Sequence, residues 1–148
     1  MSLKERLLKD LKQSMKEKDT IKKSTITMVR AAVLQVEKDK KIELNDEEII
    51  DIIAKQVKQR KDALQDFKRG AREDLMEQTQ REIAILTEYL PQQLSKGEIE
   101  NIVMETISEV GAVSIKDMGK VMSAIMPKVK GRADGAIVNK FVKQHLQE

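Results

Sequence analysis

Apolar side chains recur at helical spacing through almost the whole chain, and this periodicity restricts the fold more than any other feature. The pattern begins with Leu3, Leu7 and Leu11 and is still present at Val138 and Phe141 near the other end. Residues three and four apart share one face of an α-helix, so each run can bury an apolar stripe against its neighbours. The sequence therefore predicts an all-α protein.

Composition agrees with helices and removes one class of chemistry. Aromatic residues make up only 2% of the 148 residues, and the chain has two prolines and six glycines. It has no cysteine, which excludes disulfides, thiolate zinc sites and cysteine nucleophiles. We expect a chain dominated by helix-forming residues, with no cofactor and no metal site.

Helix start and stop signals divide the chain into seven predicted helices. Capping boxes, in which Ser or Asn is followed three residues later by Glu, mark helix starts at Ser2, Asn45 and Ser95. Pro91 is expected to stop the fourth helix and Pro127 to end the sixth. The predicted helices run over about 3–18, from 20, over about 46–69 and about 73–90, and then from 96, 115 and 135.

The boundary between two domains is placed near residue 93. There the helix stop at Pro91 is followed at once by the capping box of Ser95 and Glu98. We therefore expect a four-helix bundle-like domain over residues 1–93 and a small three-helix tail domain over residues 94–148.

Charge is distributed unevenly, although the net charge is only +3. Residues 1–41 hold twelve basic and six acidic side chains, whereas residues 42–93 hold eight and twelve. Within the predicted tail domain, residues 113–145 hold seven basic and two acidic side chains. We interpret the basic excess of residues 1–41 as a solvated helix surface, with a surface that binds RNA as the alternative.

The beginning of the chain and the length of its apolar runs bear on its location. The beginning lacks the apolar segment of a secretory signal, and no apolar run approaches the ~18 residues of a membrane span. On these grounds we expect a cytoplasmic chain with no membrane partner.

Three short motifs carry a resemblance to a known family. They are YLPQQLS at residues 89–95, MGKVM at residues 118–122 and KVKGRADG at residues 128–135. On these motifs the chain resembles the YqeY-like proteins over essentially its whole length. Such proteins are similar to the C-terminal helical and tail domains of the B subunit of aspartyl/glutamyl-tRNA amidotransferase.

The resemblance implies a tail that binds tRNA, and a link to a carbon–nitrogen ligase that uses glutamine as amido-N-donor. The residues argue against catalysis by this chain alone. The sequence has no glycine-rich phosphate loop, no Gly-x-Ser-x-Gly motif and a single histidine, His145. We expect no catalytic residue here, and leave open whether the chain joins a ligase complex.

The basic loop before the last predicted helix is the candidate RNA-binding site. Free N–H groups at a helix N-terminus favour phosphate, and a glycine lets a sugar–phosphate backbone approach closely. Spacing alone favours a solvated loop with ordinary lysines, and the resemblance turns the prediction toward phosphate contact. With the resemblance, the predicted RNA-binding residues are Lys120, Lys128, Lys130, Gly131, Arg132 and Lys140.

Three nearby residues are assigned structural roles. Asp134 is interpreted as the N-cap of the last helix, which Gly135 then begins. Gly119 lies inside a predicted helix, where glycine costs about 1 kcal/mol relative to alanine. We expect close helix–helix packing to compensate, with approach of an RNA backbone as the alternative.

Together these observations predict a stand-alone tRNA-binding module. Because aromatic residues are too few for a base-stacking platform, we expect it to contact the RNA backbone and to recognise shape. The alternative is a helical adaptor that binds a protein partner, such as a tRNA amidotransferase or an aminoacyl-tRNA synthetase.

Overall fold

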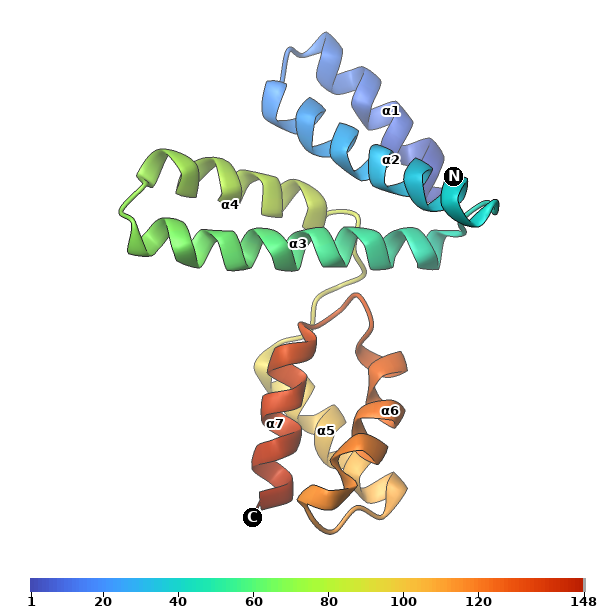
Figure 1. Cartoon of the computed structure of the whole chain (residues 1–148), viewed down its shortest axis with the longest axis vertical. Coiled ribbons are helices and arrows are strands. Elements are labelled where there is room, and N and C mark those ends of the chain that lie inside the picture. The colour runs from blue at the N-terminus through green and yellow to red at the C-terminus, as the bar shows by residue number, and fades with distance from the viewer. Residues whose placement is uncertain (148) are drawn as a thin grey trace. The chain divides into compact units, whose positions relative to one another are not determined.

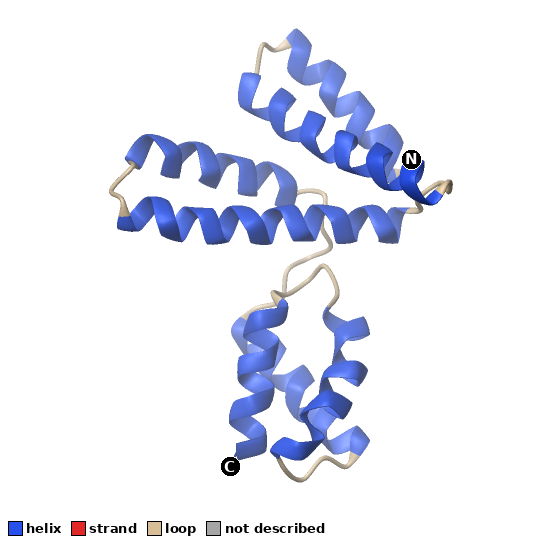
Figure 2. Cartoon of the chain, viewed as in Figure 1, coloured by secondary structure: helices blue, strands red, loops and turns tan. Residues whose placement is uncertain are grey.

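The computed structural model describes residues 1–147, and within them the chain is all-α as predicted, with no strand (Figure 2). None of the described helices is long and apolar enough to cross a membrane. The elements are α1 (Leu3–Lys16), α2 (Thr20–Lys40), α3 (Asp46–Arg69), α4 (Glu73–Thr87), α5 (Lys96–Val110), the 3-10 turn η1 (Ile115–Asp117), α6 (Met118–Val129) and α7 (Gly135–Gln147).

The chain forms two compact units, each with its own apolar core. Unit 1 runs from Met1 to Leu90 and contains α1 to α4. Unit 2 begins at Pro91 and contains α5 to α7 with the turn η1.

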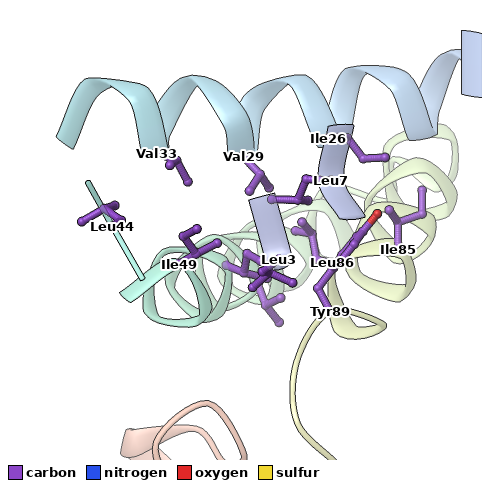
Figure 3. Close-up of a cluster of buried hydrophobic side chains, with 12 residues drawn as sticks. Leu3, Leu7, Ile26, Val29, Val33, Leu44, Ile49, Ile85, Leu86 and Tyr89 are labelled. Atoms are coloured by element: carbon purple, nitrogen blue, oxygen red, sulfur yellow. The ribbon is translucent and has the colours of Figure 1, made fainter. Parts of the chain in front are cut away.

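Unit 1 is built from two helical hairpins, α1 with α2 and α3 with α4 (Figure 1). Their apolar stripes meet in one core, part of which Figure 3 shows. Burial of each large apolar side chain stabilises the fold by about 1.5–3 kcal/mol. The fully buried large side chains of this core are Leu7, Ile26, Val29, Ile49, Ile53 and Leu86.

Unit 2 is a three-helix arrangement in which α5, α6 and α7 pack on one another. Its buried side chains recur every four residues on α6 and α7. The buried members of this core are Ile99, Val103, Val121, Ile125, Val129, Val138, Val142 and Leu146.

Helix starts follow the predicted capping boxes. The Ser2 hydroxyl accepts a hydrogen bond from the Glu5 amide at 3.1 Å, and the Asn45 side chain accepts one from the Glu48 amide at 2.9 Å. A third box joins Ser95 to Glu98 at the start of α5. Because each box satisfies donors that the first turn of a helix leaves unpaired, local sequence fixes where these helices begin.

Two predicted helix ends are wrong. α4 ends at Thr87, well before Pro91, and the chain turns so that Tyr89 packs into the core and its hydroxyl donates to the Asp10 carboxylate. α6 continues through Pro127 to Val129. A proline in a helix loses its own N–H bond and crowds the carbonyl four residues earlier, but its φ is compatible with a helix. Val129 is fully buried, which favours the last turn.

Glu37 joins three segments of unit 1. Its carboxylate pairs with the Lys4 ammonium on α1 and accepts a hydrogen bond from the Leu44 amide at 2.8 Å, in the loop before α3. The Lys4 hydrogen bond, followed by that of the Leu44 amide, holds the pKa of Glu37 below its usual value. A lowered carboxyl pKa means that the charged form stabilises the fold, and this contribution is lost as the pH falls.

We therefore expect Glu37→Gln to unfold at a lower temperature than the wild type at neutral pH. The difference should shrink as the pH falls below the ordinary carboxyl pKa of 4.5, because wild-type Glu37 then becomes protonated too. Thermal unfolding followed by circular dichroism, repeated from neutral to acid pH, measures the difference in unfolding temperature. Glu77→Gln, at an exposed site on α4, is the control. A Glu37→Gln deficit that stays constant into acid would contradict this role.

Candidate nucleic-acid interface

The basic turn between α6 and α7 has a defined backbone conformation. Gly131 has a φ of +72°, in the left-handed region that favours glycine. The amides of Arg132 and Ala133 both donate to the Val129 carbonyl, at 2.8 and 3.1 Å. The last residues of α6 therefore lead directly into a tight turn.

A second segment of unit 2, Gln92–Leu94, holds this turn by three hydrogen bonds. The Leu94 amide donates to the Arg132 carbonyl at 2.9 Å, and the Gln93 side-chain amide donates to the Gly131 carbonyl at 2.7 Å. Arg132 in return donates from Nε to the Gln92 carbonyl at 3.1 Å. Sequence reasoning used this segment as a domain boundary and missed its role, although it lies in one of the three family motifs.

The Arg132 side chain is partly buried, and the bond from Nε fixes its direction. Within residues 1–147, its two terminal guanidinium nitrogens have no hydrogen-bond partner. Glu98 lies within reach of its charge: hydrogen bonds with Ser95, and to a lesser extent Arg132, hold the pKa of Glu98 below its usual value. Arg132 is thus a cation held in a fixed position, and its two terminal nitrogens can still donate hydrogen bonds.

Lys128 has partners inside unit 2. Its ammonium donates to the Thr106 hydroxyl at 3.0 Å and to the Glu109 carboxylate at 2.7 Å, both on α5. The contact ties the end of α6 to α5. His145 makes a similar cross-link, with Nε2 at 3.1 Å from Glu100 on α5.

Of the other predicted lysines, Lys130 belongs to the turn, whereas Lys120 lies on α6 and Lys140 on α7. Lys120 is exposed in the first turn of α6, and ten helical positions separate it from Lys130, or about 15 Å along the axis. Lys130, beside Gly131, is exposed but is not without a partner in the structure. Lys140 is exposed on α7. The predicted residues therefore form a dispersed basic surface with one ordered turn.

Asp134 and Gly135 lie at the start of α7. The Asp134 carboxylate accepts a hydrogen bond from the Ala136 amide at 2.9 Å, and its carbonyl accepts from the Ile137 and Val138 amides. This is the behaviour of a helix cap. Throughout residues 1–147, no group of three or more His, Cys, Asp or Glu side chains could hold a metal ion.

The packing role expected for Gly119 is wrong. A Cβ added at this position would meet no atom within 4 Å, and the residue is exposed. Within the described chain, nothing offsets the helix cost of this glycine.

Fold and surface thus define a small all-α protein with two units, the second of which carries an ordered basic turn. Comparison with known proteins identifies the group: the chain belongs to the Yqey-like protein family, whose family model matches residues 4–146.

The relatives are of two kinds. "Altered inheritance of mitochondria protein 41, mitochondrial" is 28% identical over 97% of this chain and 78% of the relative in Pyrenophora tritici-repentis, and 32% identical over 91% and 78% in Saccharomyces cerevisiae (strain YJM789). In Kluyveromyces lactis it is 36% identical over 70% and 58%. The E subunit of the glutamyl-tRNA(Gln) amidotransferase of Thermococcus sibiricus is 41% identical over 37% of this chain and 9% of the relative.

These relatives correct the expected location. The cytoplasmic prediction is contradicted, because the relatives matched over most of this chain are mitochondrial by name. The prediction rested on the absence of a secretory segment and of a membrane span. Neither feature bears on import into an organelle, so the inference did not follow.

The open surroundings of Gly119 lead to a stability prediction. Gly119→Ala should stabilise α6 by about 0.5–1 kcal/mol, because alanine restricts the unfolded chain and meets no obstacle in the helix. Hydrogen exchange of α6 amides in the full chain measures this locally. Gly111→Ala is the opposing control, since its φ of +68° disfavours a side chain. A destabilised Gly119→Ala would show that the site is not open.

Proposed function

We propose that unit 2 binds tRNA through its sugar–phosphate backbone, with the turn Lys130–Arg132 as the principal contact. The observation that carries the proposal is the fixing of this turn by three hydrogen bonds with residues 92–94, combined with the unpartnered terminal nitrogens of Arg132. An ordered cationic turn loses little conformational entropy on binding an anion.

The chemistry of the turn suits phosphate. A guanidinium presents donors in a planar fork that matches two phosphate oxygens, and such charge-assisted bonds are stronger than neutral ones. Gly131 has no side chain to keep a backbone away. Lys120 and Lys140 are exposed elsewhere on unit 2 and add positive charge to it.

The relatives support RNA as the polyanion. One of them is by name part of a glutamyl-tRNA(Gln) amidotransferase, so a protein of tRNA metabolism shares part of this sequence. We propose binding and no reaction, because the turn offers cations and N–H donors that neutralise charge without forming a covalent bond. Lys128 is assigned to the support of α6, since Thr106 and Glu109 already occupy its ammonium.

Charge reversal at the turn tests the proposal. The double variant Lys130→Glu/Arg132→Glu should bind tRNA at least about tenfold more weakly at low salt. Its plot of log affinity against log salt should also be flatter, by about one unit for each phosphate that is no longer neutralised. Fluorescence anisotropy with labelled tRNA, repeated across a salt series, measures both quantities.

The matched control is Lys58→Glu/Lys61→Glu, which makes the same change in charge at two exposed sites on α3 of unit 1. Circular dichroism checks that both double variants fold. Equal losses in the two variants would mean that only net charge matters. The proposal fails if the wild type binds no tRNA at low ionic strength.

The order of the turn is tested without altering charge. Gln93→Ala removes the bond to the Gly131 carbonyl and should weaken tRNA binding about two- to tenfold, the range expected for one hydrogen bond. The salt dependence should not change, because no cation is lost. Gln92→Ala is a close control, since Gln92 contributes its carbonyl and not its side chain. If the two variants bind tRNA equally well, the hydrogen bond that holds the turn does not contribute to affinity.

A further inference from the structure

Unit 1 carries a shallow apolar cleft on the α1–α2 hairpin. Its volume is about 280 Å³. Leu7 and Val33, which also belong to the core, form its floor, and Leu8 and Leu34 form its walls. The walls are unusually open for leucines: Leu8 is 38% and Leu34 57% exposed.

The apolar surface continues along α1 beyond the cleft. Met15 lies seven residues after Leu8, which is two helical turns, so the two side chains share a face of α1. Met15 is 52% exposed. Two exposed apolar side chains at helical spacing on α1, beside Leu34 on α2, offer a surface onto which a third helix can pack.

Within residues 1–147, the cleft keeps one unpaired cation, and the α1–α2 hairpin around it is basic as a whole. Of its charged lining residues, Lys4 is occupied by Glu37 and Glu43, and Glu5 is held in the capping box of α1. Arg30 is left, and in the described chain it has no ion-pair or hydrogen-bond partner. Residues 1–41 as a whole hold twelve basic side chains against six acidic ones.

From this geometry we infer that the α1–α2 cleft is a docking site for an acidic amphipathic helix of a partner protein. Leucine-like side chains of that helix fill the cleft between Leu8 and Leu34, and a carboxylate pairs with Arg30. The cleft is at the small end of the range for small-molecule sites, but it accepts two or three side chains of a helix.

Charge selects this occupant over a second copy of the chain. Self-pairing through the same face would bring together two hairpins that each hold twelve basic side chains against six acidic ones, which is unfavourable. A partner helix with carboxylates beside its apolar stripe meets the cleft with complementary charge, which favours encounter and fixes orientation.

The test uses the full chain and a synthetic peptide of ~18 residues, helical by design, with leucines on one face and glutamates flanking them. Amide NMR spectra of the isotope-labelled protein are recorded during the titration. We expect shifts concentrated on α1 and α2 around Leu8, Arg30 and Leu34. A peptide with lysines in place of the glutamates should bind about tenfold more weakly.

Two variants locate the contact. Leu34→Glu and Arg30→Glu should each weaken binding of the acidic peptide about tenfold, since one removes an apolar wall and the other the cationic partner. Lys58→Glu, on α3, makes the same charge change as Arg30→Glu and should have little effect. Leu34 is mostly exposed, so its replacement leaves the core intact, and the unbound spectrum verifies folding.

Three results would overturn the inference. The first is absence of shifts at millimolar peptide, and the second is equal affinity for the acidic and basic peptides. The third is concentration-dependent dimerisation, seen by sedimentation and abolished by Leu34→Glu, which would assign the cleft to a second copy. The tRNA proposal is unaffected by any of these, because it concerns residues of unit 2 only.

Discussion

Burial of apolar stripes is the constraint on which every element of this chain depends. Its helices run from 12 to 24 residues and are rich in charge, and isolated helices of this length are marginal in water. Each therefore persists because its stripe is covered by other helices of the same unit. The two cores then position what lies outside them: the ordered basic turn on unit 2 and the α1–α2 cleft on unit 1.

The parts of the fold that could be predicted from the sequence are those that nearby residues determine. The capping boxes at Ser2, Asn45 and Ser95 act within four residues, so they fixed three helix starts correctly. The ends of α4 and α6 were missed because tertiary packing decides them. Tyr89 leaves its helix to be buried against α1, and Val129 is held in helical form by the core of unit 2.

The same distinction applies to the candidate site. Glycine and cations in KVKGRADG located the turn, because Gly131 adopts the left-handed conformation that favours glycine. Sequence could not tell that Lys128 is occupied, since Thr106 and Glu109 come from another helix. Nor could it tell that Gly119 faces open space. Side-chain contacts between helices depend on the angles at which the helices pack, and these angles cannot be predicted from a single sequence.

The two proposed surfaces use charge in different ways, although both are basic. At the turn, neutralisation of phosphates would supply most of the binding free energy, which makes affinity steeply dependent on salt. At the cleft, apolar burial would supply it and Arg30 would mainly orient the partner, so salt would change the association rate more than the affinity. An acidic helix at the turn or an RNA at the cleft would lack one of these contributions. The two proposals therefore assign different partners to the two surfaces: RNA to the turn and an acidic amphipathic helix to the cleft.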